Sequence, residues 1–279
     1  MNHLISLTDL SMQDLEKIFQ AADEIQAQKH ADALSGKTFL LFFPASSIRT
    51  RITFEMAVHY LGGKVILFPS AALDKKEDIA DVVGYINNWA DFLIVRHKDK
   101  NLVSNIANNS KVGVINAMTD ANHPCEVLSD LYSLSKIRSN FLSLQYTFVG
   151  IKGNIGLAWR EASLAFGIKL NQCCPPGYEM EDIVAAHDLK KAVANSDLVI
   201  TDPMPQSVRE STDCLTYQVT SQIMESANHG ALLNPCPPFF REEEVSKEVM
   251  DSAYFVGYAF KKSLLSVQAA VILLCSQGK

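Results

Sequence analysis

The stretch Ser46-Ser47-Ile48-Arg49-Thr50-Arg51-Ile52-Thr53-Phe54-Glu55 joins a strand to a helix and indicates the class of the fold. The apolar run before it, 38–43, ends at a proline and predicts a buried strand, and the apolar spacing after it, 56–61, predicts a helix. A helix start carries free N–H donors and a partial positive charge, and arginine adds a bidentate fork. The stretch therefore predicts an anion site. The alternative is a capped helix whose arginines are solvated or paired with Glu55.

Chain length and charge limit the class of protein. The 279 residues suggest two domains, and 48% apolar with 20% charged residues is typical of a soluble globular protein. The net charge of −6 argues against a nucleic-acid partner. A local basic pocket can still bind an anionic substrate.

The N-terminus and the cysteines indicate the compartment. The chain lacks the pattern of a signal peptide and a run of about 18 apolar residues, so we expect a cytoplasmic protein without a membrane span. Its six cysteines show neither Cys-x-x-Cys pairing nor zinc-ligand spacing. We read them as reduced thiols and expect no metal.

Apolar runs alternate with helical patterns along the chain. Such alternation predicts parallel sheets covered on both faces by helices. The predicted strands are 38–43, 64–68, 92–95, 112–116, 146–149, 169–175, 197–202 and 231–233. The predicted helices begin near Ser11, after the anion stretch, at Ile79, at Pro124 and after Gly153, and the last spans about 263–275.

A glycine-rich turn, Gly150 to Gly156, follows the strand 146–149 and opens a helix. This order is also typical of a dinucleotide-binding domain. The spacing here is Gly-x-x-Gly-x-x-Gly, and no acidic residue ends the next strand to hold a ribose. We therefore favour a site without a nicotinamide cofactor, and we expect no cofactor of any kind.

Two segments resemble the aspartate and ornithine carbamoyltransferase family. Residues 47–55 match the family's Ser-x-Arg-Thr-Arg-x-Ser/Thr-Phe-Glu at every fixed place, and 123–131 resemble His-Pro-x-Gln-x-Leu-x-Asp-Leu. Glu126 stands in place of the glutamine. An ionised carboxylate only accepts hydrogen bonds, so Glu126 must bind an amino group, be protonated or turn away. Beside Arg49 and Arg96 we expect it to stay ionised.

The resemblance implies a carbamoyl-phosphate site in the first half. Its catalytic residues would be Thr50, Arg96 and His123, since Arg96 ends a strand as in the family's Met-Arg-His segment. Lys76 is the candidate for a lysine that reaches in from a neighbouring subunit. The full set of carbamoyl-phosphate-binding candidates is Ser47, Ile48, Arg49, Thr50, Lys76, Arg96, His123 and Glu126.

The second half resembles the ornithine branch, with departures. Asn154 falls on the asparagine that contacts the acceptor, and Asp202 ends a strand as in Thr-Asp-x-Trp. Residues 234–238 resemble the family's His-Pro-Leu-Pro, which offers backbone carbonyls to the carbamoyl group. The acceptor-binding candidates are Asn154, Asp202, Cys236 and Pro237.

Three family features are missing: the Ser-Met-Gly after Asp202, the aspartate-gripping arginine near Gly156, and the Glu-Asn-Arg that Lys261-Lys262-Ser263 replaces. We therefore expect aspartate and ornithine themselves to be poor acceptors.

The fold class expected is two α/β domains, each a mostly parallel sheet flanked by helices. Residues 1–135 would bind carbamoyl phosphate, with the C-terminal helix in 260–279 packing back on them, and 140–258 would bind the acceptor. The function implied is carbamoyl transfer to an amine of an amino acid or related metabolite, ornithine-type rather than aspartate-type, by a homotrimer with sites at subunit interfaces. The alternative is a catalytically silent binding or regulatory protein.

Overall fold

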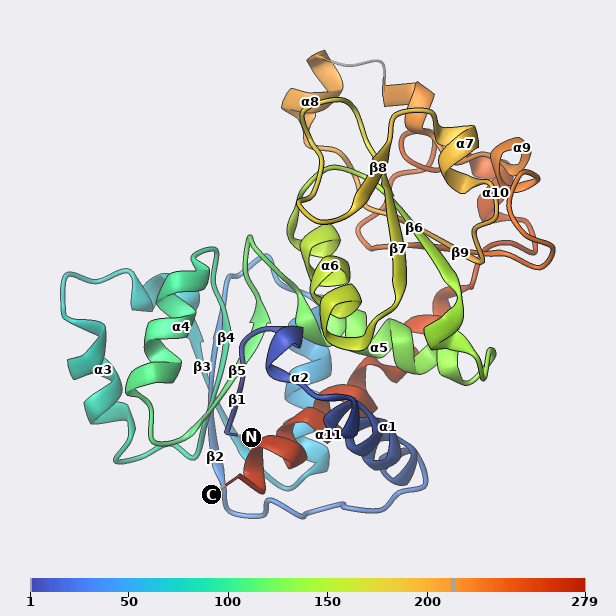
Figure 1. Ribbon diagram of the computed structural model, residues 1–279. Coiled ribbons are helices and arrows are strands. Elements are labelled where there is room, and N and C mark those ends of the chain that lie inside the picture. Colours follow the sequence, from blue (N-terminus) through green and yellow to red (C-terminus); the bar gives the residue numbers. More distant parts are fainter. Residues whose placement is uncertain (1, 212–213, 279) are drawn as a thin grey trace. The chain divides into compact units, whose positions relative to one another are not determined.

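The computed structural model describes residues 2–211 and 214–278 (Figure 1). These residues form two compact units, with divisions after Lys136 and after Phe260, so that the C-terminal segment belongs to the first unit. Each unit contains one five-stranded sheet in which all pairings are parallel. The prediction of a two-domain α/β protein with parallel sheets is confirmed.

The sheet of the first unit has the strand order β1-β5-β4-β2-β3. Its strands are β1 (His3–Leu4), β2 (Thr38–Phe43), β3 (Lys64–Pro69), β4 (Phe92–Arg96) and β5 (Gly113–Met118). The apolar runs predicted all of these except β1, whose two residues are too few to show a pattern. Because the strands are parallel, the segments after β2, β4 and β5 leave the sheet at the same edge.

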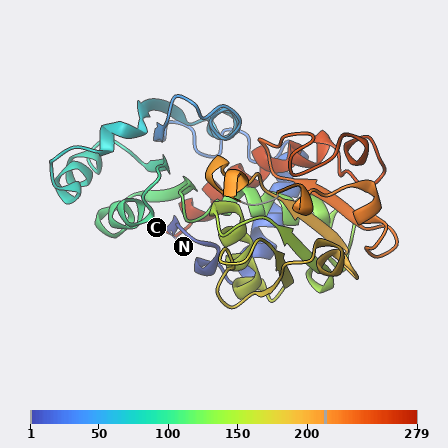
Figure 2. The same ribbon diagram turned by 90° about the horizontal axis from the view of Figure 1, so that it is seen from above.

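Helices cover both faces of this sheet (Figures 1 and 2). They are α1 (Met12–Gln26), α2 (Arg49–Tyr60), α3 (Ile79–Ile86), α4 (Lys100–Asn109), α5 (Pro124–Ser135) and α11 (Leu264–Ser276), with short 3-10 helices η1 (Leu7–Asp9) and η2 (Ser70–Leu73). A third 3-10 helix, η5 (Tyr258–Ser263), contains the division after Phe260. On one face, α3 and α4 share a core with side chains of β2, β4 and β5. On the other, α11 packs against α1, α2 and α5.

Helix α11 is a core element of the first unit. Nearly all of its residues are buried. The stretch Tyr258–Ser276 is long and apolar enough to cross a membrane by length and composition, but 67% of an 18-residue segment of it is buried inside the protein. The core helix of a soluble protein passes the same test, so this finding is weak evidence for a membrane span.

Strand β3 differs from the expectation of a sheet covered on both faces. It lies at one edge of the sheet and pairs only with β2. Its apolar side chains are exposed, among them Ile66 at 47% and Phe68 at 39%. An apolar run predicts a strand with apolar side chains, but it does not show which element of the chain, if any, covers them. Within the described residues, β3 is an uncovered apolar edge.

The sheet of the second unit has the strand order β10-β9-β6-β7-β8. Its strands are β6 (Gln145–Val149), β7 (Lys169–Cys173), β8 (Val184–Ala186), β9 (Leu198–Thr201) and β10 (Leu232–Pro235). The helices of this unit are α6 (Asn154–Phe166), α7 (Leu189–Val193), α8 (Gln206–Ser211), α9 (Ser221–Met224) and α10 (Lys247–Met250), with the 3-10 helices η3 (Phe141–Ser143) and η4 (Cys214–Tyr217). The core that contains Val149, Val199 and Leu233 is completed by α7 to α10. Trp159 of α6 stacks at a tilt on Tyr146 of β6.

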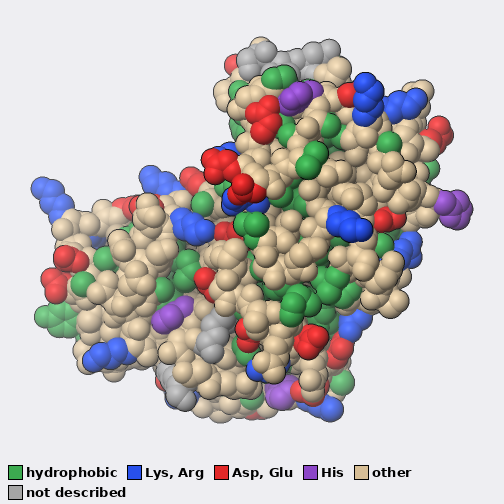
Figure 3. All heavy atoms as spheres, in the orientation of Figure 1, with side chains coloured by type: hydrophobic (Ala, Val, Ile, Leu, Met, Phe, Trp, Pro, Cys, Tyr) green, Lys and Arg blue, Asp and Glu red, His purple; other side chains and the backbone are tan. Residues whose placement is uncertain are grey.

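Charged side chains of both signs are interspersed on the face drawn in Figure 3. Lysine and arginine are not gathered there into one continuous basic area. This distribution agrees with the mixed composition and the net charge of −6.

Candidate active site

The start of α2 has the free donors that the sequence predicts. Its N-cap residue, Ile48, makes no side-chain capping bond, so the first N–H groups of the helix have no side-chain partner from that position. Ser47 and Thr50 are buried, at 4% and 5% exposure. Arg49 is exposed and Ile48 is 65% exposed. Hydroxyls thus line the protein side of a helix start, and Arg49 lies at its solvent side.

Arg96 links the end of β4 to this helix start. Its Nη1 donates to Ser47 Oγ at 3.0 Å and to Thr50 Oγ1 at 3.1 Å. Burial lowers the pKa of Arg96, and the charge of Arg49 lowers it further. Two cations near each other and near the positive end of α2 are stabilised by a bound anion. The arrangement is that of a phosphate-type anion site.

Arg51 is paired with Glu55, as in the alternative of a capped helix with paired arginines. Its Nε donates to Glu55 Oε1 at 2.6 Å, one turn further along α2. The pair is more than a third exposed. Of the two arginines in the motif, one is therefore paired within the helix, and Arg49 is the one that lies beside Arg96.

His123 begins α5, after the end of β5, and is buried. Burial lowers its pKa to about 4, against the opposing effect of Glu126, so its ring is neutral at pH 7. Among the described residues, neither His123 Nδ1 nor Arg96 Nε has a hydrogen-bond partner. Buried polar atoms normally have partners, and a bound substrate can supply them.

Glu126, also buried, has a partner that the sequence did not predict. Lys261 Nζ lies 2.8 Å from Glu126 Oε1 and 2.6 Å from Asp130 Oδ1. Burial raises the pKa of Glu126, but Lys261, His123 and Arg49 together outweigh this, Lys261 most of all, and the pKa lies below its ordinary value. Of the alternatives for Glu126, the structure thus shows an ionised carboxylate bound to an amino group of the chain itself, that of Lys261. The signal that could have found it was the lysine in place of the family's Glu-Asn-Arg segment.

Lys76 does not lie in this cluster. It is exposed in the segment between η2 and α3. Nearby, His97 Nε2 lies 3.0 Å from Asp74 Oδ1, and the N–H of Asp99 donates to His97 Nδ1 at 3.1 Å. Because Nδ1 accepts, the proton is on Nε2, which donates to Asp74. The end of β4 is thereby tied to the segment that carries Lys76.

In the second unit, the strand ends bring three acceptor-binding candidates to one edge. Strands β6, β9 and β10 are neighbours, and Asn154, Asp202 and Cys236 follow their carboxyl ends. A Cβ added at Gly153 would lie 3.9 Å from Asp202 Oδ2, so this carboxylate lies near the first turn of α6. Cys236 is buried, and its N–H donates to Thr201 O at 2.9 Å. Pro237 is half-buried.

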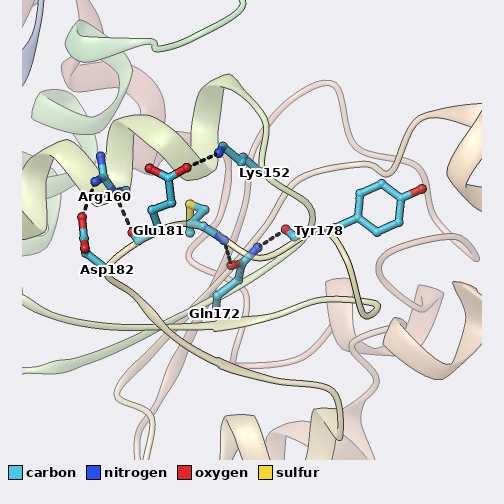
Figure 4. Close-up of polar contacts among 7 residues, drawn as sticks. Lys152, Arg160, Gln172, Tyr178, Glu181 and Asp182 are labelled. Carbon is cyan, nitrogen blue, oxygen red and sulfur yellow. Dashed lines mark hydrogen bonds and ion pairs between the residues drawn. The ribbon is translucent and has the colours of Figure 1, made fainter.

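Polar contacts hold the loop after β7 against α6 (Figure 4). Buried Gln172 donates to the carbonyls of Gly150 and Tyr178, at 2.9 and 3.1 Å, and accepts from Met180 N at 2.7 Å. Arg160 of α6 pairs with Asp182 at 2.6 Å. The glycine-rich turn is thus fixed by the next strand and its loop.

A small cavity of about 100 Å³ in the second unit is lined in part by Asp202, Arg209 and Glu244. Arg209 forms an ion pair with Glu243. Burial raises the pKa of Glu244, whose Oε1 accepts from Phe240 N at 2.6 Å. The surroundings of Asp202 are therefore mainly acidic and suit a cationic group.

Within residues 2–211 and 214–278, histidine, cysteine, aspartate and glutamate side chains form no cluster of three or more that could hold a metal ion. The six cysteines, all of them described, form no disulfide with one another. Together, the fold and the cluster around Arg96 define a two-domain α/β protein with a phosphate-type anion site.

Comparisons with known families agree with this class. Residues 2–136 match the carbamoyl-P binding domain of aspartate/ornithine carbamoyltransferase, and residues 143–275 match the Asp/Orn binding domain. The chain is 30% identical over 299 residues to the ornithine carbamoyltransferase of Chromohalobacter salexigens, covering 99% of this chain and 98% of the relative. It is 31% identical over 294 residues to that of Acinetobacter baylyi, covering 98% and 96%.

Solved structures show the same fold. The ornithine carbamoyltransferase of Pyrococcus furiosus superimposes with a TM-score of 0.92 at 25% identity, over 100% of this chain and 98% of that one. The enzyme from Burkholderia thailandensis gives 0.90 at 26%, over 100% and 99%. The chain belongs to the aspartate/ornithine carbamoyltransferase family and is a carbamoyltransferase.

Proposed function

We propose that the protein transfers the carbamoyl group of carbamoyl phosphate to an amine of an amino acid or related metabolite, ornithine-type rather than aspartate-type. The observation that carries the proposal is the bridge from Arg96 to Ser47 and Thr50 at the uncapped start of α2. The bridge joins the proposed phosphate site to the Arg96 guanidinium, which could bind the carbamoyl oxygen of the same substrate. The relatives from Chromohalobacter salexigens and Acinetobacter baylyi, both named ornithine carbamoyltransferase, support the choice of acceptor type.

In the proposed mechanism, Ser47, Arg49 and Thr50 bind the phosphate group together with the N–H groups of α2. Arg96 and the neutral ring of His123 polarise the carbamoyl oxygen. An uncharged amine attacks the carbonyl carbon, and the same groups stabilise the tetrahedral oxyanion. The carbon–oxygen bond to phosphate then breaks, and phosphate takes up the proton that the amine loses. Orientation and charge stabilisation supply the catalysis, without a covalent intermediate.

For the acceptor, we propose a molecule with a second, cationic group. Asp202 and the nearby acidic side chains support this, because they match an ammonium group and repel a carboxylate. Because the Ser-Met-Gly after Asp202 and the family's Glu-Asn-Arg are missing, we expect an amine other than ornithine. Asn154 and the carbonyls of Cys236 and Pro237 would complete this side.

We also propose the homotrimer and the cytoplasmic location expected from the sequence. An apolar stripe of exposed side chains on α2, formed by Ile48, Ile52 and Met56, supports a subunit interface, and so does the exposed edge strand β3. In such an assembly, Lys76 would contribute to a neighbouring site. The free thiols support a reducing compartment. Sedimentation equilibrium tests the trimer, and a monomer would contradict it.

Phosphate release from carbamoyl phosphate, measured over a panel of amines that includes ornithine, lysine, diaminobutyrate and aspartate, tests the function. We expect turnover with at least one basic amino acid.

Calorimetry of the same protein tests the phosphate end, where Arg49→Ala should weaken carbamoyl-phosphate binding by on the order of 2–4 kcal/mol. Tight binding without turnover on any amine would favour the silent binding protein.

A further inference from the structure

Lys261 joins the C-terminal segment to the helix that carries His123. It lies in η5, just before α11, and its ammonium group contacts Glu126 once and both oxygens of Asp130, at 2.6 to 2.8 Å. The two carboxylate side chains are 9% and 3% exposed, and that of Lys261 is 21% exposed. One partly buried lysine therefore serves two buried carboxylates. Burying such charges is costly, so their arrangement calls for a role beyond stability.

The position of Glu126 suggests that role. It follows His123 by about one helical turn, and its charge acts on both His123 and Arg96. Carbamoyl phosphate offers acceptor oxygens, which arginine can bind, and one NH2 group, which needs an acceptor. Around the bridge from Arg96 to α2, the cationic side chains supply only donors. The Glu126 carboxylate is the charged acceptor beside them.

We propose that Lys261 is a positioning residue for carbamoyl transfer: its ammonium group fixes the Glu126 carboxylate beside His123, where that carboxylate accepts the N–H groups of the carbamoyl moiety. The proposal rests on the proposed function and extends it to a residue more than a hundred positions away in the chain. Lys261 acts through Glu126. Its removal should therefore affect the carbamoyl end of the site and leave the phosphate end intact.

The neighbouring Lys262 offers a matched control, because it is exposed and its replacement changes the net charge equally. We expect Lys261→Met to lower kcat/KM for transfer by about tenfold or more, and Lys262→Met by less than twofold. Affinity for inorganic phosphate, the probe for the phosphate end, should change less than twofold in both. Lys261→Arg, which keeps the charge and the donors, should restore most of the activity.

A double variant tests whether Lys261 acts through Glu126. If it does, Glu126→Gln combined with Lys261→Met should be no slower than Glu126→Gln alone, because the group that lysine positions is already gone. A double variant at least tenfold slower than the single would overturn the proposal. This comparison also serves if Lys261→Met alone does not fold, since the double variant buries one carboxylate fewer.

The acid limb of the pH profile gives a second readout. The charged groups that act on His123 are Glu126 from α5, Arg96 from β4 and Lys261 from η5. Arg49 from α2 acts on Glu126, and Asp130 from α5 pairs with Lys261. Lys261 lowers the pKa of His123 and Glu126 raises it. Lys261→Met should therefore move the acid limb of kcat/KM to higher pH, and Lys262→Met should not. Equal acid limbs in the two variants would contradict an effect of the Lys261 charge at the carbamoyl end of the site.

If the wild-type protein transfers to no amine, the proposed function fails but the positioning role can still be tested. Calorimetry with carbamoyl phosphate and with inorganic phosphate separates the two. Weaker binding of carbamoyl phosphate alone in Lys261→Met, by about tenfold against Lys262→Met, supports the role. Equal binding of both probes in the two variants would overturn it.

Discussion

The carboxyl edges of the two sheets carry their candidate residues in different ways. In the first unit, side chains at or after the ends of β2, β4 and β5 interact directly, by hydrogen bonds or through their charges. Arg96, for example, donates to Ser47 and Thr50. In the second unit, Asn154, Asp202 and Cys236 share an edge, and the backbone around them is held by strand pairing and by the buried amide of Gln172.

This difference separates two tasks of a carbamoyltransferase. A phosphate dianion and a developing oxyanion need preformed cations and donors, which a side-chain cluster provides. An acceptor is distinguished by the shape and charge of loops, and these can change without disturbing the cluster. Substitutions at the first edge should therefore change the rate of transfer, and substitutions at the second edge should change the affinity for the acceptor.

Replacing Arg96 should have the largest effect. Arg96→Met removes the cation and both bonds to the hydroxyls of Ser47 and Thr50, so kcat/KM should fall by about 10³-fold, or about 4 kcal/mol. Steady-state phosphate release measures it, with the exposed Lys98→Met just beyond the same strand as the control. A loss below tenfold in a folded variant would mean that the cluster is not the reacting centre.

Acid should weaken the first unit more than the second. An unfolded histidine binds a proton below about pH 6.5, whereas buried His123 does so only below about 4. Between these values the unfolded state binds more protons, so stability falls as pH falls, by about 3 kcal/mol in total. Urea unfolding from pH 7 to 4.5, followed by hydrogen exchange of each unit, measures the loss. His123→Gln should flatten this dependence, and an unchanged slope would contradict the assignment.

The second edge is tested at Asp202. Asp202→Asn removes a charge of the acidic surroundings but keeps the shape, so KM for a basic acceptor should rise about tenfold to a hundredfold, on the order of 2 kcal/mol. Affinity for carbamoyl phosphate should stay within twofold by calorimetry. Equal losses for both substrates would mean that Asp202 supports the fold of the unit rather than the acceptor.

The sequence predicted what depends on neighbouring residues. The helix predicted to begin near Ser11 does so, with a capping box between Ser11 and Asp14, and the anion stretch has its strand, free helix start and hydroxyls. Prediction was incomplete where distant segments meet. The exposure of β3 depends on what packs on a sheet edge, and the partner of Glu126 lies 135 residues away, in Lys261. Neither leaves a local pattern, although the lysine in place of the family's Glu-Asn-Arg was visible.

The smallest effect is expected at Arg51, which shares α2 with Arg49. Its ion pair with Glu55 is 40% and 36% exposed, and solvent screens it, so Arg51→Ala should change the free energy of unfolding by no more than about 0.5 kcal/mol. Carbamoyl-phosphate affinity should stay unchanged, because this arginine is paired within the helix and Arg49 lies beside Arg96. Calorimetry on Arg49→Ala and Arg51→Ala in parallel decides between the two roles. Equal losses of affinity would extend the anion site along α2 and show that the cluster around Arg96 is only part of the first edge.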